Sequence, residues 1–334
     1  MRGQVDAVQS RGRGVRVTLR MLAVTALVLL IVAGAVPNVL RPMLPGPVAD
    51  VGRSPALAIG PADRVALRTT FGPVVEELPA EDLVALSGGA TNVAPPDALP
   101  QGVARAGTRC HEVFVLGARG SGESDRSREG LGLTVATAVT TIGERLALHD
   151  LAVTGLDYPA EPIATLVDSP QKYLDGIERG VAKTVEILTE RAAQCPAEVA
   201  VLVGFSQGAM VMHRAIDELA ASAPTVLDRV AGVLLIADGD RFPTADIAHF
   251  GSAEPRVGYV GVGHMFSAGQ PGGAMPSALH GRVASVCDAG DPVCDPRSVS
   301  LHAYERHTGY KIGHVAARDA ALVVADRVAG HVAT

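Results

Sequence analysis

The stretch from Glu198 to Ala220, EVAVLVGFSQGAMVMHRAIDELA, narrows the possible folds of this 334-residue chain. The run Val199–Val203 is apolar throughout, Gly-Phe-Ser-Gln-Gly follows it, and apolar residues return at helical spacing from Ala209. This order predicts a buried strand, a sharp turn and a helix. A serine at such a turn has strained backbone geometry and a hydroxyl that points out over the sheet edge, and the two glycines let the strand and helix approach closely. Ser206 is therefore a candidate nucleophile.

The residue after this serine indicates how a negative charge would be stabilised. Gln207 opens the predicted helix, where unpaired N–H groups and the helix dipole favour an oxyanion. Ordinary glycine-rich turns also match the pentapeptide. The position of the motif between a buried strand and an amphipathic helix is what favours a nucleophile.

Strand and helix patterns alternate from Cys110 onward. The strand patterns lie at 111–116, 151–156, 199–203, 230–237 and 283–286, and the helical patterns at 131–149, 173–193, 209–220 and 315–328. The alternation predicts an α/β fold with a central parallel sheet, helices on both faces, and functional groups at the carboxyl ends of the strands. The Gly-, Ala- and Pro-rich segment 238–281 interrupts this rhythm. It fits either a flap over a site or a surface insertion.

The N-terminal third has a different composition. Residues 2–20 carry five arginines and residues 21–36 are apolar and uncharged, which is the pattern of an export signal. Small residues before Val36 suit cleavage there, and an uncleaved anchor is the alternative. The stretch that follows is rich in Pro, Gly and Ala. We predict a signal peptide or membrane anchor over 1–35, a linker or N-terminal extension over 36–108, and one α/β domain over 109–334, located outside the cytoplasm.

Charge and aromatic content argue against some partners. The formal net charge is -6, and because the first 35 residues carry +4, the remainder carries about -10. This sign repels nucleic acid. Aromatic residues make up 3% of the chain and Trp is absent, which disfavours stacking platforms for bases or sugars. We therefore expect no nucleic-acid partner.

The four cysteines, at positions 110, 195, 287 and 294, suit two disulfides in an exported protein. Three pairings are possible. Cys287 and Cys294 are seven residues apart, which suits a local bridge and leaves Cys110 to pair with Cys195. A zinc site is the alternative, but C-x6-C lacks the short spacing usual for zinc ligands.

A serine nucleophile needs a histidine to take its proton and an acid to orient that histidine, and on this fold type both follow the serine in the order acid, then histidine. Asp291 follows a predicted strand, lies between the two nearby cysteines and has Gly290 and Pro292 beside it. Three other aspartates compete for the role of acid: Asp238, Asp288 and Asp295. Asp291 is the preferred acid because of its position.

The base is less well determined by the residues alone. Three histidines follow Asp291: His302, His307 and His314. A glycine-containing loop after His307 would let its side chain reach across the sheet edge, whereas His314 opens the final helix. The choice between them stays open on this reasoning.

Four motifs together resemble the cutinase family of serine esterases, from about Thr108 to the C-terminus. In chain order they are GARGSGE, GFSQG, C-x3-D-x2-C and H-x2-Y. The resemblance implies a triad of Ser206, Asp291 and His307. It also implies an oxyanion hole made by Ser121 and Gln207, and disulfides joining Cys110 to Cys195 and Cys287 to Cys294. Phe205 stands where many members have Tyr, a change that we do not expect to affect the chemistry.

The Arg-rich, Lys-poor, Ala-rich composition is similar to that of actinobacterial members. The resemblance implies a monomeric, secreted or envelope-associated serine esterase that hydrolyses hydrophobic lipid or polyester esters and needs no metal or cofactor. Two other functions stay open: an acyltransferase acting on cell-envelope lipids or sugars, and a non-catalytic envelope scaffold.

Overall fold

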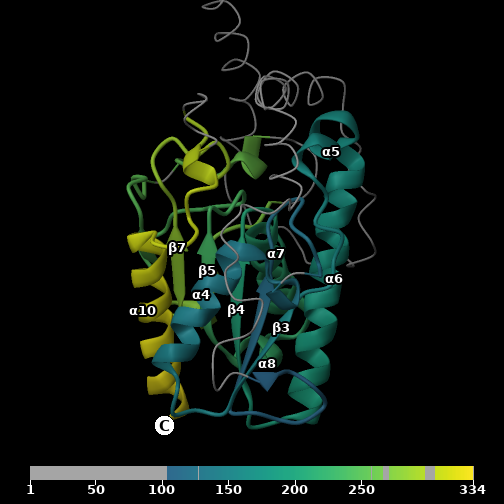
Figure 1. The fold of residues 1–334 in the computed structure, drawn as a ribbon, viewed down its shortest axis with the longest axis vertical. Coiled ribbons are helices and arrows are strands. Elements are labelled where there is room, and N and C mark those ends of the chain that lie inside the picture. Colours follow the sequence, from purple (N-terminus) through teal and green to yellow (C-terminus); the bar gives the residue numbers. More distant parts are fainter. Residues whose placement is uncertain (1–103, 127, 257, 266–270, 298–304, 334) are drawn as a thin grey trace, which may run out of the picture. The chain divides into compact units, whose positions relative to one another are not determined.

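A parallel β-sheet forms the centre of the described part of the chain (Figure 1). The computed structural model describes residues 104–126, 128–256, 258–265, 271–297 and 305–333. The seven strands have the order β1-β3-β2-β4-β5-β7-β6, and every neighbouring pair is parallel. They are β1 (Ala104–Arg105), β2 (Val113–Ala118), β3 (Leu151–Gly155), β4 (Val199–Phe205), β5 (Val230–Ile236), β6 (Ala248–Phe250) and β7 (Val283–Val286).

Helices cover both faces of this sheet, and the alternating side chains of each strand explain why. On β2, Val113 and Val115 face one hydrophobic cluster, and Phe114 and Leu116 face the other. The first cluster includes α4 (Gly132–Arg145) and α10 (Val315–Val332), which lie side by side at the left of Figure 1. The second includes α5 (Ile163–Asp168), α6 (Pro170–Gln194), α7 (Gln207–Ser222) and α8 (Pro224–Leu227). The predicted α/β fold is confirmed.

The central strands are apolar throughout because helices bury both of their faces. Every residue of β2, β5 and β7 is buried, as are the last six residues of β4. Because the strands are parallel, their carboxyl ends all lie at the same end of the sheet. The turn after β4 and the loops after β2 and β7 lie at that end.

The described residues of the segment 238–281 include regular secondary structure that its sequence pattern did not predict. It contributes β6 to the edge of the sheet and two short 3-10 helices, η2 (Val262–Met265) and η3 (Ser277–Leu279); a third, η1 (Arg128–Gly130), precedes α4. Met275 and Leu279 are buried in the core. Much of this segment is therefore part of the packed domain.

Both disulfides are formed as predicted. Cys110 bonds to Cys195 and Cys287 bonds to Cys294, with Cα atoms 5.4 and 5.9 Å apart. The first bridge joins the start of β2 to the end of α6, and the second closes the loop after β7. Disulfides of this kind persist in oxidising compartments.

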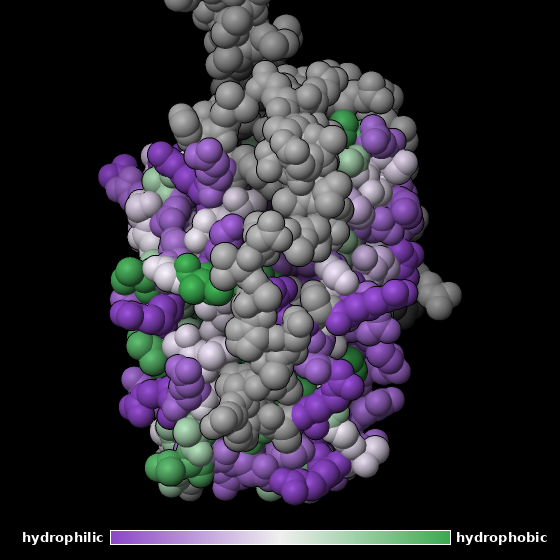
Figure 2. All heavy atoms as spheres, viewed as in Figure 1, coloured by the Kyte–Doolittle hydropathy of each residue, from purple (hydrophilic) through white to green (hydrophobic). Residues whose placement is uncertain are grey.

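The face drawn in Figure 2 is mostly hydrophilic where described residues are visible, with small hydrophobic groups on the side of α10. Within the described ranges, no helix is long and apolar enough to cross a membrane. The predicted signal or anchor over 1–35, and nearly all of the predicted linker over 36–108, lie outside the described residues. The three-part division of the chain stays a prediction.

Candidate active site

Ser206 lies at the turn between β4 and α7 and has a strained backbone, with φ 53° and ψ -117°. Two glycines make this turn possible. A Cβ on Gly204 would lie 2.6 Å from the Cα of Ala209, and one on Gly208 would lie 2.1 Å from the carbonyl oxygen of Ala118. Both distances are far too short for a side chain, so the strand and helix can meet only through glycine. The predicted sharp turn is present.

His307 bridges Ser206 and Asp291. Its Nε2 lies 2.9 Å from Oγ of Ser206, and its Nδ1 lies 3.1 and 3.0 Å from the two carboxylate oxygens of Asp291. In this geometry Nδ1–H donates a hydrogen bond to the carboxylate, which leaves the Nε2 lone pair directed at the serine hydroxyl. The arrangement lets the imidazole take a proton from Ser206.

The acid is held rigidly behind the histidine. Asp291 is fully buried, and its Oδ1 also accepts hydrogen bonds from the amides of Val293 and Cys294, at 2.7 and 3.3 Å. These hydrogen bonds fix the orientation of the Asp291 side chain. The Cys287–Cys294 bridge closes the loop that holds them.

Phe205 touches the histidine as well. Its ring stacks on the ring of His307, with centroids 5.3 Å apart and planes 23° apart. The ring of Phe205 therefore helps to fix the orientation of the imidazole. The expectation that Phe in place of Tyr does not affect the chemistry stays a prediction. Sequence reasoning considered only the turn, and the contact depends on a loop a hundred residues further along.

The competing aspartates and histidines have other partners. Asp288 accepts a hydrogen bond from the imidazole of His314 at 2.9 Å, and Asp295 pairs with Arg297 at 2.5 Å. Asp238 lies 2.7 Å from Nδ1 of His213. None of these aspartates contacts His307 among the interactions of the described residues, and His302 lies outside those residues.

The two predicted oxyanion-hole residues follow β4 and β2, at the end of the sheet where these parallel strands finish. Gln207 is the first residue of α7, so its amide has no acceptor within the helix and is available at the N-terminus. Ser121 lies in the loop after β2, and its hydroxyl donates a hydrogen bond to the carbonyl of Glu161 at 2.5 Å. In this resting state the hydroxyl proton of Ser121 therefore points to the protein backbone.

A buried arginine, Arg119, and a partly buried glutamate, Glu123, hold the Ser121 loop. The guanidinium of Arg119 donates to the carbonyls of Glu123, Leu156 and Tyr158, at 2.8, 3.0 and 2.6 Å. The carboxylate of Glu123 accepts from the amides of Gly120 and Leu133, at 2.6 and 2.9 Å. Burial raises the pKa of Glu123, while these backbone hydrogen bonds lower it in part. Two side chains of the GARGSGE motif, Arg119 and Glu123, thus hold the backbone of the loop that contains them.

Sequence reasoning missed a second buried polar cluster, located behind the nucleophile helix. His213 and Arg214 on α7 pair with Asp238 and Asp240, which follow β5, at 2.7 and 2.5 Å. Burial lowers the pKa of His213, but the charges of the aspartates outweigh it and raise this pKa to about 9. The imidazole also lies 2.9 Å from the carbonyl of Gly273. The signal in the sequence is the pair His213 and Arg214 directly after the apolar run Ala209–Met212.

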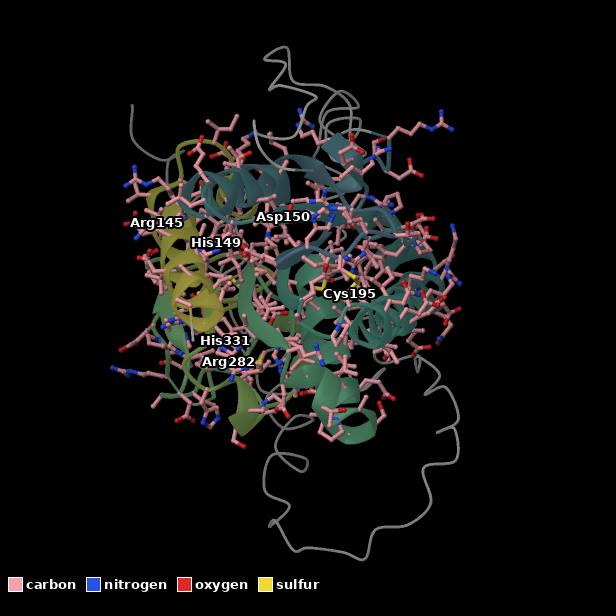
Figure 3. All side chains as sticks on the ribbon, turned by 90° about the horizontal axis from the view of Figure 1, so that it is seen from below. Arg145, His149, Asp150, Cys195, Arg282 and His331 are labelled. Atoms are coloured by element: carbon pink, nitrogen blue, oxygen red, sulfur yellow. A yellow bond between two sulfur atoms is a disulfide. The ribbon has the colours of Figure 1, made fainter. Side chains whose placement is uncertain are left out.

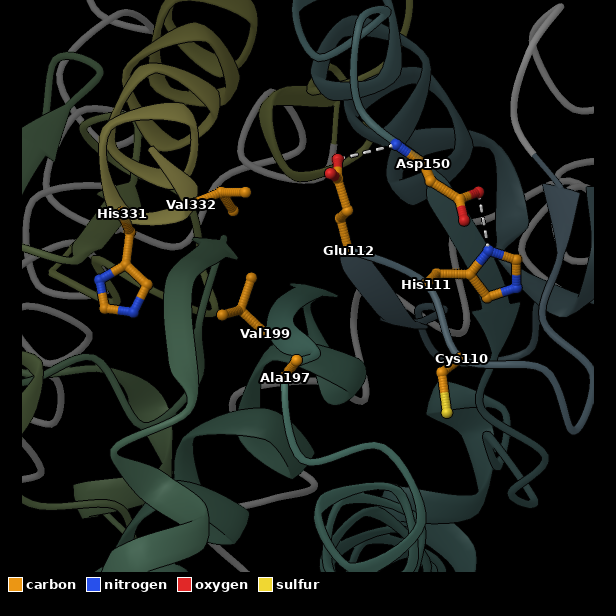
Figure 4. A pocket seen from close by; sticks show the side chains of 8 residues that line it. All are labelled: Cys110, His111, Glu112, Asp150, Ala197, Val199, His331 and Val332. Carbon is orange, nitrogen blue, oxygen red and sulfur yellow. Dashed lines mark hydrogen bonds and ion pairs between the residues drawn. The ribbon is translucent and has the colours of Figure 1, made fainter. Parts of the chain in front are cut away.

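A separate hollow lies at the other end of the sheet, where the strands begin. Asp150, Cys195 and Arg282, labelled in Figure 3, lie just before β3, β4 and β7. The hollow measures about 510 Å³, and in Figure 4 His331 lies across it from His111 and Asp150. It is remote from Ser206. Nowhere in the described ranges do three or more His, Cys, Asp or Glu side chains form a group that could hold a metal ion.

A parallel sheet covered by helices, with a serine at the strand-to-helix turn and a histidine and aspartate after it in the chain, defines the α/β-hydrolase fold. Residues 109–327 match the Cutinase family. The chain therefore belongs to the cutinase family, which confirms the resemblance inferred from its motifs. It is a carboxylic ester hydrolase by this membership.

Two relatives compared by sequence agree with this assignment. The chain is 33% identical over 174 residues to cutinase CUT1 of Coprinopsis cinerea, covering 52% of this chain and 78% of that protein. It is 28% identical over 205 residues to the carboxylesterase Culp6 homolog of Corynebacterium glutamicum, covering 56% and 66%. A solved structure of a cutinase-like protein from Cryptococcus sp. is similar at 21% identity and a TM-score of 0.49, covering 67% of this chain and 95% of that one.

Proposed function

We propose that this protein is a secreted or envelope-associated serine esterase that hydrolyses hydrophobic lipid or polyester esters. The observation that carries the proposal is the position of His307, with ring nitrogens 2.9 Å from the Ser206 hydroxyl and 3.0 Å from the Asp291 carboxylate. In this proposal Ser206 is the nucleophile, His307 is the general base and acid, and Asp291 orients the imidazole.

The reaction proceeds through an acyl-enzyme. Oγ of Ser206 attacks the ester carbonyl carbon while Nε2 of His307 takes the hydroxyl proton. The amides of Gln207 and Ser121, with the Ser121 hydroxyl, donate hydrogen bonds to the oxyanion. His307 then protonates the leaving alcohol. In the second half, water attacks the acyl carbon while Nε2 of His307 takes its proton. The imidazolium returns this proton to Oγ of Ser206 as the carboxylic acid leaves. Asp291 keeps its contact with Nδ1 and stabilises the imidazolium in both halves of the reaction.

Two features support action outside the cytoplasm. Disulfides such as Cys110–Cys195 and Cys287–Cys294 are typical of exported proteins. The basic and then apolar residues over 1–35 have the pattern of an export signal. We also propose that the protein acts as a monomer, with an ester as its small-molecule partner and with contact to a membrane or envelope.

Hydrolysis of p-nitrophenyl esters with acyl chains of two to sixteen carbons tests the proposal. Wild-type protein with intact disulfides is compared with Ser206→Ala and His307→Ala, and His314→Ala is the matched control because His314 pairs with Asp288 instead. We expect both triad variants to lose roughly 10³-fold or more in kcat/KM and the control to lose little. Activity retained by Ser206→Ala would refute the proposal.

The same proteins separate the two alternatives. Labelling of Ser206 by a fluorophosphonate without release of nitrophenol to water would favour an acyltransferase that needs an alcohol acceptor on an envelope lipid or sugar. A folded, oxidised protein whose Ser206 is not labelled would favour a scaffold.

A further inference from the structure

Tyr310, the last residue of the H-x2-Y motif, takes no part in the proposed reaction. It lies three residues after His307 and is 1% exposed. Its hydroxyl accepts a hydrogen bond from the backbone amide of Asp288 at 2.8 Å and lies 3.7 Å from Sγ of Cys294. Because Cys294 is in a disulfide, its sulfur carries no hydrogen, so the tyrosine hydroxyl is the donor in the second contact. Both hydrogen-bonding functions of this hydroxyl are therefore directed at the loop that the Cys287–Cys294 bridge closes.

The two contacts lie on either side of the triad acid. Asp288 precedes Asp291 by three residues, and Cys294 follows it by three. The carbonyl of Asp288 accepts a hydrogen bond from the amide of Asp291 at 3.1 Å, and the amide of Cys294 donates to Oδ1 of Asp291 at 3.3 Å. The Tyr310 hydroxyl thus contacts both residues that fix the turn carrying the carboxylate.

The ring of Tyr310 faces the histidine side of the same site. Its centroid lies 6.3 Å from that of the Phe205 ring, which in turn stacks on the ring of His307 at 5.3 Å. Burial raises the pKa of Tyr310, and the neighbouring carboxylate of Asp291 raises it further. The phenol therefore keeps its proton at any pH at which an imidazole works as a base. Tyr310 connects the segment that carries His307 to the loop that carries Asp291.

A second link between these two segments is weaker. The imidazole of His314 lies 2.9 Å from the carboxylate of Asp288, but the two side chains are 18% and 25% exposed. Water competes with a partly exposed pair of this kind, whereas the hydroxyl of Tyr310 belongs to a buried residue. The Tyr310 contact therefore fixes the separation of the two segments more firmly.

We propose that Tyr310 is a positioning residue for the triad, whose hydroxyl holds the loop of Asp291 against the segment of His307 so that the carboxylate stays within hydrogen-bond distance of Nδ1. The role rests on the proposed function. It acts through Asp291 and not by contact with the substrate. The carboxylate stabilises the imidazolium that forms when Ser206 loses its proton, so its distance from the ring determines how far the rate is raised.

A double-mutant cycle with the acid tests this role. Tyr310→Phe keeps the ring and removes only the hydroxyl. We expect it to lower kcat for p-nitrophenyl butyrate by about tenfold per titrated active site, with KM nearly unchanged, because a small displacement of a catalytic group is costly. In the Asp291→Asn background the same change should cost less than about twofold, since the carboxylate through which Tyr310 acts is absent. Equal losses in both backgrounds would overturn the proposal.

Tyr158 offers a matched control in the hydrophobic cluster on the other face of the sheet. It is also buried, but its hydroxyl donates to the carbonyl of Arg119 at 2.6 Å and not to the loop of Asp291. Tyr158→Phe should therefore cost the same in the wild-type and Asp291→Asn backgrounds. If Tyr158→Phe coupled to Asp291→Asn as strongly as Tyr310→Phe does, the coupling would be a general effect of losing a buried hydroxyl, and the assignment to Tyr310 would fail.

The Nδ1 proton of His307 reports the same contact without turnover. Its hydrogen bond to Asp291 slows its exchange with water. We expect Tyr310→Phe to speed this exchange, followed by NMR of the imidazole proton, by about fivefold or more, and Tyr158→Phe to leave it unchanged. Only folded molecules contribute to this signal, so a lower folded fraction does not imitate the effect. An unchanged exchange rate in Tyr310→Phe would refute the role and leave the proposed function standing if the wild type is active, whereas a wild type that is inactive and unlabelled at Ser206 refutes both.

Discussion

His307 is held on three sides, and each contact limits a different motion. Asp291 fixes the Nδ1 edge, Ser206 lies at Nε2, and the Phe205 ring covers one face. The imidazole is 13% exposed at the side chain, so only a small part of it meets solvent. Its tautomer and its tilt are therefore set before a substrate arrives, which is the condition for efficient proton transfer.

Replacing the acid by its amide tests the tautomer directly. Asp291→Asn keeps a carbonyl oxygen for the amides of Val293 and Cys294 but turns a donor toward His307. We expect the esterase kcat to fall by roughly 10²- to 10⁴-fold, because the imidazole is then held in the wrong tautomer. Asp288→Asn is the matched control, since Asp288 pairs with His314. A control loss as large as that of Asp291→Asn would contradict the assigned acid.

His213 makes stability depend on pH in a defined direction. Burial alone would lower its pKa, but the charges of Asp238 and Asp240 raise it from 6.5 to about 9 in the folded protein. Asp217 and Arg214 also face this cluster. Because the folded pKa is raised, the charged imidazole contributes its full stability below about pH 6.5. That contribution is lost as the pH rises through about 9.

Thermal unfolding between pH 6 and 10 measures this contribution. We expect the wild-type Tm to fall more steeply toward pH 10 than that of His213→Gln, which cannot titrate there. The difference between the two should be largest at pH 6 to 7. His280→Gln, on a partly exposed histidine 3.8 Å from Asp246, should keep the wild-type slope. Parallel curves for wild type and His213→Gln would contradict the charged pair.

Helix α7 connects the nucleophile to this charged cluster. Ser206 and Gln207 stand at its N-terminus, and His213 and Arg214 lie two turns further on, paired with residues that follow β5. The helix is thus fixed at both of these points. Displacing α7 from the sheet would move the serine and the oxyanion amide together.

Gly208 provides a test of that coupling. A Cβ at this position would lie 2.1 Å from the carbonyl oxygen of Ala118 at the end of β2. We expect Gly208→Ala to destabilise the protein by about 1–3 kcal/mol, as overpacking usually does, and to lower esterase activity. Gly330→Ala in α10 is the control, because no atom lies within 4 Å of its added Cβ. That control should be neutral or up to about 1 kcal/mol stabilising, since Ala favours helix. Wild-type activity and Tm in Gly208→Ala would contradict the close approach.

The elements that sequence analysis found are the ones with a clear period. The helix expected at 131–149 ends at Arg145, and the turn at Ser206 lies where the pentapeptide predicted it. Three short elements were not predicted, because none of them shows a repeating pattern. Strand β1 has two residues, β6 has three, and α5 lies between prolines. Edge strands of this length depend on a neighbouring strand for their structure, and a local pattern cannot reveal that neighbour.

The sequence predicts the candidate reactive groups more readily than their supports. Ser206 and Asp291 follow from the strand-turn-helix pattern and the loop between two cysteines, whereas His307 follows from the family resemblance, because the residues alone leave three histidines open. The contacts of Phe205 and of the His213 cluster depend on residues far apart in the chain, and no spacing rule predicts them. Sequence alone therefore identifies the groups that would react, and the fold identifies the groups that hold them.

The two disulfides lie at opposite ends of the sheet, and we expect the removal of each one to affect a different property of the protein. Cys110 and Cys195 are 85 residues apart and lie where the strands begin, whereas Cys287 and Cys294 are seven apart and close the loop that carries Asp291. In the chain-entropy view, stabilisation grows with loop length, giving roughly 4 to 5 kcal/mol for the long bridge and roughly 2 for the short one. The long bridge should matter more for stability and the short one for the site.

Paired Cys→Ala variants measure this difference. We expect the variant without Cys110 and Cys195 to lose more in Tm while keeping the kcat of its folded fraction, because that bridge lies far from Ser206. The variant without Cys287 and Cys294 should unfold closer to the wild-type temperature but lose about tenfold or more in kcat, since Asp291 is then less firmly held. Active-site titration with a fluorophosphonate corrects both rates for unfolded protein. If removing the short bridge left kcat unchanged, the loop would hold Asp291 through the Val293 and Cys294 amides alone.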